Sequence, residues 1–294
     1  MKHACLARHR GELPTRLLCK LLGVSPAGYY AARQREASPR ARSDQRLRLA
    51  IRAAHSASHR RYGRPKLHRE LRDQGWRCGH NRLARLMRLD GVRAKRVRAF
   101  RVTTQSGHTQ PVAANHLARR FAPTAYPERD RAWAADITYL PTREGWLYLA
   151  VVLDLASRRV VGWSASARLD RELTLDALRR ALALRRPAPG ALHHSDRGVQ
   201  YACDAYQRLL ADHKFCCSMS RPGDCWDNAV VESFFATLKT ELAEDAHWPT
   251  RAAAHRSLIE FIDVWYNQRR RHASLGYLTP VQYELEVLTR CHAA

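Results

Sequence analysis

The sequence lacks any apolar run long enough to cross a lipid bilayer, which takes about eighteen residues. It also lacks an N-terminal segment in which charged residues precede an apolar stretch. The first absence argues against a membrane-spanning helix, and the second argues against a secretory signal. We therefore predict a cytosolic protein that makes no contact with a membrane.

Paired cysteine motifs are missing as well. None of the eight cysteines forms a CxxC pair, and in a cytosolic chain all of them are expected to be reduced. His55 and His59 have an H-x₃-H spacing that occurs in zinc sites, but Cys78 downstream has no second cysteine three residues later. A zinc module is therefore disfavoured.

Acidic residues are scarce in the first part of the chain. Residues 1–120 contain 29 Lys or Arg and 6 Asp or Glu, whereas residues 121–294 contain 22 and 21, so nearly all of the net charge of +24 lies in the first part. A segment this basic is typical of proteins that bind nucleic acid, because each phosphate that they neutralise releases counter-ions. The alternative is a cationic surface that serves only solubility.

Two helical pairs are predicted in this basic part. Residues 16–22 have apolar residues at helical spacing, Gly23 breaks the pattern, and Ser25-Pro26 is a typical start for a second helix. This is the outline of a helix-turn-helix, although unrelated helical hairpins share it. The second pair is predicted at residues 64–74 and 81–90.

The remaining residues of the basic part are predicted to be linkers. Residues 36–43 have few apolar side chains and contain Pro39, and residues 93–120 are basic and poor in periodicity. We expect the longer linker to become ordered on DNA. The predicted units are thus residues 1–43, residues 44–122 and a larger unit at residues 123–294.

The larger unit alternates between strand and helix patterns. Strands are predicted at residues 133–141, 147–153, 159–165, near 192–195 and at 215–218, and helices at residues 169–184, 200–213, 227–242 and 251–268. This order permits an α/β fold with a mixed five-stranded sheet flanked by helices.

Three carboxylates stand out in this unit. Asp136 lies in the first strand, Asp196 follows a short strand, and Glu232 lies on a helix that Asp227 or Asn228 would cap. Lys239 falls on the same face of that helix as Glu232. Taken alone, Glu232 and Lys239 would be a solvated pair on an amphipathic helix. Asp154 is the main alternative to Asp136 as the first metal ligand, and it can also form a turn with Ser157 and Arg158.

Carboxylates that converge need a counter-charge. Two like charges about 4 Å apart repel by roughly 4 kcal/mol at an effective dielectric constant of about 20. Oxygen ligands suit Mg²⁺ or Mn²⁺, and two such ions would bind the attacking and leaving oxygens of a phosphodiester. The three carboxylates therefore predict a metal site for phosphoryl transfer.

The spacing of these carboxylates, with thirty-five residues between Asp196 and Glu232, resembles the acidic triad of the retroviral-integrase superfamily. Several longer stretches resemble the bacterial insertion-sequence transposases encoded by a second reading frame, often called OrfB: WAADITYLP, LYLAVVLDLASRRVVGW, HHSDRGVQY, SMSRPGDCWDNAVVESFFATLKTEL and WYNQRRRHASLGYLTPVQYE. The resemblance is close from residue 125 to residue 284 and looser upstream.

This resemblance implies a ribonuclease H-like core with Asp136, Asp196 and Glu232 as catalytic residues and as ligands of two Mg²⁺ or Mn²⁺ ions. It implies a transposase that cleaves and joins the double-stranded DNA ends of an insertion sequence. It also implies a homo-oligomer on DNA in the bacterial cytosol, and in this family the product of an upstream frame is often a fusion partner. Since the family places a basic residue seven positions after the glutamate, Lys239 is expected to contact DNA.

Two arginine clusters are further DNA-binding candidates. The family's helical segment upstream of the core suggests Arg82, Arg85 and Arg88, which would otherwise be ordinary exposed arginines. Arg269, Arg270 and Arg271 follow a long helix, where they would suit a phosphate backbone or only compensate the helix dipole. Two other functions remain open: a non-catalytic DNA-binding regulator, and a structure-selective nuclease of the same fold.

Overall fold

The computed structural model describes residues 2–9, 11–34, 36–94, 112–126, 128–222, 225–243 and 246–288. Most of the linker predicted at residues 93–120 thus lies outside the described residues. Within these ranges, no helix combines the length and the apolarity that a membrane crossing requires.

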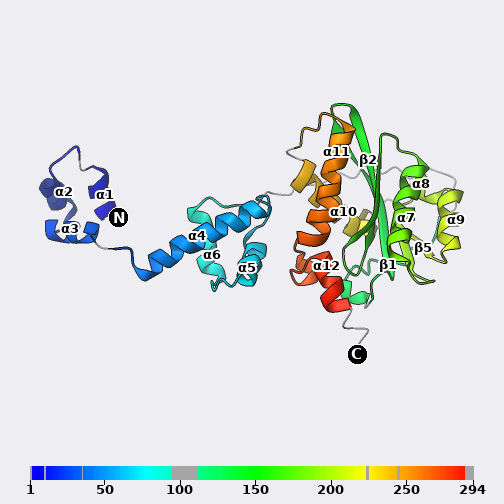
Figure 1. Ribbon diagram of the computed structural model, residues 1–294, viewed down its shortest axis with the longest axis horizontal. Helices are drawn as coiled ribbons and strands as arrows, with labels where there is room; N and C mark the ends of the chain where they lie inside the picture. The colour runs from blue at the N-terminus through cyan, green and yellow to red at the C-terminus, as the bar shows by residue number, and fades with distance from the viewer. Residues whose placement is uncertain are drawn as a thin grey trace.

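The first three helices form a small cluster of their own (Figure 1): α1 (Lys2–Arg8), α2 (Thr15–Leu22) and α3 (Pro26–Gln34). They pack around Leu6, Leu18, Cys19 and Tyr29. Gly23 ends α2 with a φ of 60°, a conformation that glycine adopts without strain. The Ser25 hydroxyl accepts a hydrogen bond from the Gly28 backbone N–H at 3.0 Å. The predicted helix–turn–helix outline is therefore confirmed.

The second unit has one helix more than predicted: α4 (Pro39–Ala57), α5 (Arg64–Asp73) and α6 (His80–Leu89). The linker predicted at residues 36–43 is wrong from Pro39 onward, since α4 begins there and the Ser38 hydroxyl accepts a hydrogen bond from the Ala41 N–H. Proline fits the first turn of a helix because no N–H is needed there.

A mixed five-stranded sheet forms the centre of the large unit. Its strands are β1 (Ala132–Thr142), β2 (Gly145–Asp154), β3 (Val160–Ser166), β4 (Leu192–Ser195) and β5 (Cys216–Met219), in the order β3-β2-β1-β4-β5. β1–β2 and β2–β3 are antiparallel, whereas β1–β4 and β4–β5 are parallel. The predicted strands and their mixed sheet are confirmed.

Helices cover both faces of this sheet (Figure 1). One face carries α7 (Arg171–Arg185), α8 (Val199–Ala202) and α9 (Asp204–Asp212), and the other carries α10 (Ala229–Leu238) and α11 (Arg251–Ile259). Short 3₁₀ or π-helical segments and one further helix complete the chain: η1 (Pro123–Ala125), η2 (Cys225–Asn228), η3 (Lys239–Ala243), η4 (Glu260–Arg269), η5 (Ala273–Leu275), α12 (Pro280–Tyr283) and η6 (Glu284–Leu288). The single helix predicted at residues 200–213 is in fact two, α8 and α9, with a break at Cys203.

The described end of the long linker packs on the core. Leu117 is fully buried, and the N–H groups of His116 and Leu117 both donate to the Ser218 hydroxyl beside β5. For residues 112–120, the prediction that the linker becomes ordered only on DNA is therefore wrong.

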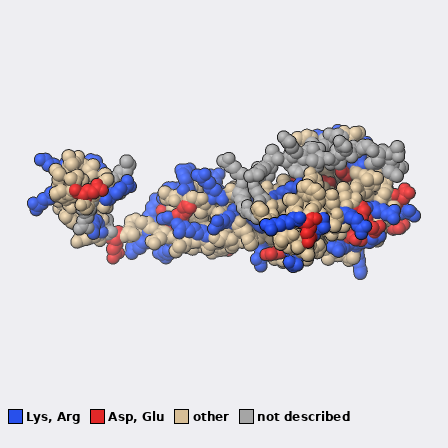
Figure 2. Space-filling view, turned by 90° about the horizontal axis from the view of Figure 1, so that it is seen from above, with Lys and Arg blue, Asp and Glu red and all other residues tan. Residues whose placement is uncertain are grey.

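The helices α4–α6 share one apolar core with the sheet face that α10 covers. The Tyr62 hydroxyl donates to the Arg269 carbonyl at 3.0 Å and accepts from the Arg271 N–H at 2.9 Å. The ring of Tyr62 also lies 5.8 Å from that of Trp265. Figure 2 shows Lys and Arg side chains over much of the visible surface of α1–α6, with smaller acidic areas among them.

Candidate active site

Asp136 and Asp196 each lie two residues beyond the last pair of two neighbouring parallel strands. β1 and β4 pair from Ala132 opposite Leu192 to Ala134 opposite His194, and both aspartates follow on the carboxyl side of that pairing. Adjacent strands are about 4.8 Å apart. β4 ends at Ser195, and Asp196 is therefore the first residue beyond its carboxyl end, where α/β proteins commonly build their sites.

Glu232 comes from the helix above the same face. Alternation along β1 places Asp136 on the side of Ala134 and Leu140, which belong to the apolar core that α10 shares. The Asn228 side-chain amide donates to the Ala135 carbonyl of β1 at 3.1 Å, one helical turn before Glu232. This bond fastens the start of α10 to β1.

The predicted capping role of Asp227 or Asn228 is wrong. Asn228 occupies the N-cap position, but its side chain makes no capping hydrogen bond. Asp227 is fully buried and bonds Arg221 and Arg119 at 2.8 and 2.9 Å, and these contacts lower the pKa of its carboxyl. Both residues hold the loop before α10 in place, a role that helix-start rules cannot reveal.

The electrostatics of Asp136 link the three carboxylates. Burial, and then the negative charges of Asp196 and Glu232, raise the pKa of Asp136 well above its usual range. Of these two charges, that of Asp196 has the larger effect on Asp136. Hydrogen bonds orient the two aspartates: the Ile137 N–H donates to Asp136 at 2.8 Å and the Gly198 N–H to Asp196 at 2.9 Å.

Lys239 adds the positive charge. Burial lowers the pKa of Lys239, and the negative charge of Asp136 opposes this shift only in part. The positive charge of Lys239 in turn lowers the pKa of Asp136. The Lys239 ammonium lies 5.1 Å from the centre of the Tyr139 ring, which meets the Trp146 ring edge to face at 4.9 Å. Sequence reasoning missed these two aromatic side chains, because their exposure, 38% for Tyr139 and 49% for Trp146, is seen only in the folded chain.

Other polar residues near the strand ends are buried and form contacts within the core. His193 contacts the Tyr206 hydroxyl at 3.0 Å, and burial lowers the pKa of His193 to about 3. Burial likewise lowers the pKa of His194 to about 4. Asp154 is fully buried at the end of β2, where it accepts from the Ala156 N–H and lies 2.8 Å from the Ser157 hydroxyl oxygen, as expected for a turn residue.

The upstream arginine candidates have partners within their own unit. Arg82 and Arg85 both form ion pairs with Asp44 of α4, and Arg82 also donates to the Ser43 hydroxyl at 2.8 Å. Arg88 is exposed. Arg82 and Arg85 therefore fasten α6 to α4, whatever else they contact.

The three arginines after the long helix differ from one another. Arg269 is exposed, whereas Arg270 bonds Glu241 at 2.9 Å. Arg271 is buried and pairs with Glu70 and Asp73 of α5 at 2.8 and 2.9 Å. Of this cluster, Arg269 is the member with the freest access to solvent.

The donor set fits a hard divalent cation. All three acidic side chains offer oxygen ligands, and they come from three separate parts of the chain. Among the described residues, no three His, Cys, Asp or Glu side chains are grouped tightly enough to hold an ion as they stand. A cation held by all three carboxylates would therefore require them to draw closer together.

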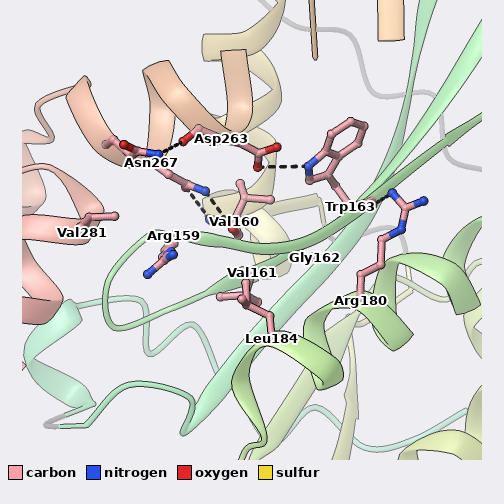
Figure 3. A pocket seen from close by; sticks show the side chains of 11 residues that line it. Arg159, Val160, Val161, Gly162, Trp163, Arg180, Leu184, Asp263, Asn267 and Val281 are labelled. Atoms are coloured by element: carbon pink, nitrogen blue, oxygen red, sulfur yellow. Dashed lines mark hydrogen bonds between the residues drawn. The ribbon is translucent and has the colours of Figure 1, made fainter. Parts of the chain in front are cut away.

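A cavity of about 450 Å³ lies elsewhere, between the edge strand β3, α7 and η4 (Figure 3). The Asn267 side chain bonds both the N–H and the carbonyl of Val160 at 3.0 Å, so it occupies part of the free edge of the sheet. The Trp163 indole donates to Asp263 at 3.3 Å. None of the three carboxylates lines this cavity.

Comparison with protein families gives three matches. Residues 127–225 and residues 213–280 match families described as "Integrase core domain", and residues 42–100 match one described as "HTH-like domain". The integrase matches cover the sheet, α10 and η4, and therefore all three carboxylates. Together with the observed strand order, they identify the ribonuclease H-like fold.

Curated relatives align over nearly the whole chain. "Transposase InsF for insertion sequence IS3A" of Escherichia coli (strain K12) is 40% identical over 286 residues, which cover 97% of this chain and 98% of that protein. The "Insertion element IS600 uncharacterized 31 kDa protein" of Shigella sonnei is 42% identical over 266 residues, which cover 90% and 97%. Among solved structures, the intasome of simian T-cell lymphotropic virus matches with a TM-score of 0.46 and 17% identity, covering 80% of this chain and 74% of that one.

Proposed function

The chain belongs to the IS3 family of insertion-sequence transposases, and on this basis we propose that it cleaves and joins the DNA ends of a mobile element through Asp136, Asp196 and Glu232. The observation that supports the proposal is that Asp136 in β1 and Asp196 just after β4 follow the parallel pairing of these neighbouring strands, with the charges of Asp196 and Glu232 acting on Asp136. That arrangement brings together acidic groups that lie up to 96 positions apart in the sequence.

Each side chain has a proposed role. Asp136 and Asp196 form the fixed part of a metal site, because Asp136 lies within β1 and the Asp196 side chain is held by the Gly198 N–H, and Glu232 completes it from α10. When bound, two Mg²⁺ or Mn²⁺ ions would lower the pKa of an attacking water or 3′-hydroxyl and stabilise the leaving oxygen. No covalent enzyme intermediate is needed. Ser195 and Asp196 are consecutive, and the Ser195 hydroxyl donates to the Asp196 carbonyl, so Ser195 is not an activated nucleophile.

Lys239 is proposed to contact a phosphate beside the scissile bond. Its ammonium is held over the Tyr139 ring, near the charge of Asp136. Arg269, Arg270 and Arg271, together with Arg82, Arg85 and Arg88, remain candidates for contacts to the element end or the target. Those with carboxylate partners would have to exchange or share them with DNA.

Several broader assignments remain predictions. We propose a homo-oligomer on DNA, since two ends must be held together, and a location in the bacterial cytosol with the nucleoid. An upstream-frame product is proposed as a fusion or partner. The division into residues 1–43, 44–122 and 123–294 also remains a prediction, with its first boundary now inside α4.

The direct test is incubation of the protein with duplexes of the element ends and Mg²⁺. Cleaved and joined products would support the proposal, nicking alone would indicate a nuclease, and binding without cleavage would indicate a regulator.

Asp196→Asn should lower joining by about 10²- to 10³-fold or more while binding of the duplex stays within about twofold, because the amide keeps the shape but loses the charge that holds the cation. The exposed Asp204→Asn is the matched control and should leave both unchanged. Equal loss of binding and joining in Asp196→Asn would contradict a role as metal ligand.

A further inference from the structure

A second cavity, of about 410 Å³, lies at the junction of the second unit and the core. Lys66 of α5, Arg158 of the turn between β2 and β3, Arg270 and His272 line it. The hydroxyl groups of Ser233 and Thr237 face it from α10. These two residues lie on a different flank of α10 from Glu232 and Lys239, so the cavity is separate from the carboxylate site.

Positive charge in this cavity exceeds negative charge. The Lys66 ammonium lies 5.3 Å from the centre of the Tyr62 ring, and no hydrogen bond or ion pair to it is found among the described residues. Burial and the charge of Arg270 lower the pKa of Lys66 to about 8, and Glu241 opposes them. Glu241 is itself already bound by Arg270 at 2.9 Å and by the Trp265 indole at 3.0 Å.

Arg158 has a buried guanidinium with one donor group left over. Its side chain is only 8% exposed, and one terminal nitrogen, Nη2, donates to the Phe121 carbonyl. The other, Nη1, is buried and has no hydrogen-bond partner in the described part of the chain. A guanidinium only donates hydrogen bonds, and a buried donor without a partner costs about 1–3 kcal/mol or more. The missing partner must therefore be an acceptor, and a negatively charged one would be favoured.

We propose that this cavity is an oxyanion site that takes a phosphate group, with Lys66, Arg158 and Arg270 as its cationic donors. Planar guanidinium groups match the oxygen geometry of phosphate, and hydroxyl groups of Ser233 and Thr237 supply further donors. Assigning the phosphate to the DNA backbone rests on the proposed function. The alternative source is a free phosphate, and the same chemistry would bind it.

The first experiment measures thermal unfolding of the full chain in sodium phosphate and in sodium chloride of equal ionic strength. Phosphate should raise the Tm of the wild-type protein above its value in chloride, because a ligand of the native state stabilises it by mass action. In Lys66→Gln the apparent Kd for phosphate should rise by about tenfold or more, since a charge-assisted hydrogen bond is lost. Lys214→Gln removes the same charge from an exposed position and should respond like the wild type.

A second variant keeps the test decisive if Lys66→Gln folds poorly. Ser274 lies at the exposed rim of the cavity, and Ser274→Asp would offer the cations a carboxylate of the chain itself. This variant should have a higher Tm in chloride and a smaller response to phosphate. If the wild type, Lys66→Gln and Ser274→Asp all respond alike to phosphate, the proposed site is overturned.

The second experiment distinguishes the two sources of phosphate. Binding of an element-end duplex is measured over a range of salt concentrations for Lys66→Gln and Lys214→Gln. A DNA phosphate in the cavity predicts that the slope of log K against log salt falls by about one for Lys66→Gln relative to the control. An unchanged slope, with the thermal response to phosphate retained, assigns the site to free phosphate. Because the thermal experiment needs neither DNA nor cleavage, failure of the proposed transposase activity would leave its result intact.

Discussion

Ser157 lies between two carboxyl groups, and its hydroxyl can donate its hydrogen to only one of them. The Ser157 oxygen is 2.8 Å from both Asp154 and Glu284. Burial opposes the ionisation of Glu284, but hydrogen bonds from Arg185 and Arg159 prevail and lower its pKa. Burial and the charge of Asp130 instead raise the pKa of Asp154 to about 7. Asp154 is therefore the carboxyl that carries a proton in the folded chain near neutral pH.

This proton predicts a pH dependence of stability. The pKa of Asp154 is about 7 in the folded chain, against an ordinary value of 3.8, so its stabilising contribution is complete below about 3.8 and is lost as the pH rises through about 7. Asp154→Asn keeps a donor toward Ser157 and does not titrate. Between pH 5 and pH 8, the free energy of unfolding of the wild type should fall relative to that of Asp154→Asn by about 2–3 kcal/mol.

Urea denaturation of both proteins at several pH values measures this difference. Groups other than Asp154 titrate in both proteins, so their effects cancel in the comparison. Parallel curves over this pH range would show that Asp154 is already ionised in the folded state.

At the scale of elements, α7 and β3 approach each other closely at Gly162. A Cβ atom at Gly162 would lie 2.2 Å from the Ala177 carbonyl oxygen and 2.7 Å from the Ala181 Cβ. Only a hydrogen atom fits there without moving the helix. Gly162 therefore sets the distance at which α7 packs on the sheet.

Gly162→Ala should lower the free energy of unfolding by about 1–3 kcal/mol, because α7 must move away from β3. Chemical denaturation of the full chain measures the change. Gly11→Ala is the control, since a Cβ there meets nothing within 4 Å. A Gly162→Ala protein as stable as this control would mean that α7 can shift at no cost.

The elements that the sequence predicted well are those with strong periodicity. The strand at residues 133–141 and the apolar strand at residues 147–153 follow from alternation and from burial on both faces. The helix α4 was missed because Pro39 reads equally as a breaker and as a first-turn residue, and only the neighbouring helices decide between the two. The role of Asn228 was missed for a similar reason, since its partner Ala135 is 93 positions away.

The candidate site was likewise predictable only in part. Asp136, Asp196 and Glu232 are predicted from the ends of elements and from a family spacing, and they remain a prediction. The sequence did not indicate that Tyr139 lies under Lys239, because alternation along β1 places Tyr139 on the opposite face from Asp136.

At the scale of the whole molecule, Arg271 helps to hold the second unit on the core. Consecutive arginines look alike in sequence, yet Arg271 reaches Glu70 and Asp73 of α5, whereas Arg269 is exposed. Arg271 also donates to the Tyr277 carbonyl at 3.1 Å. The partners on α5 lie about two hundred residues earlier in the chain, so only the folded structure distinguishes the two arginines.

Arg271→Gln should therefore affect mainly stability, and Arg269→Gln should affect mainly DNA binding. Arg271→Gln leaves Glu70 without its cation and Asp73 with Arg69 alone, and it should lower the free energy of unfolding by about 1–3 kcal/mol and speed amide hydrogen exchange in α5. Arg269→Gln should change stability by less than about 0.5 kcal/mol, but it should weaken DNA binding and reduce its salt slope by about one. Hydrogen exchange and salt-dependent binding on the same two proteins measure both effects. If exchange in α5 is unchanged in Arg271→Gln, the apolar core shared by Leu67, Leu71 and Trp265 is sufficient to hold the unit, and the ion pairs only set its orientation.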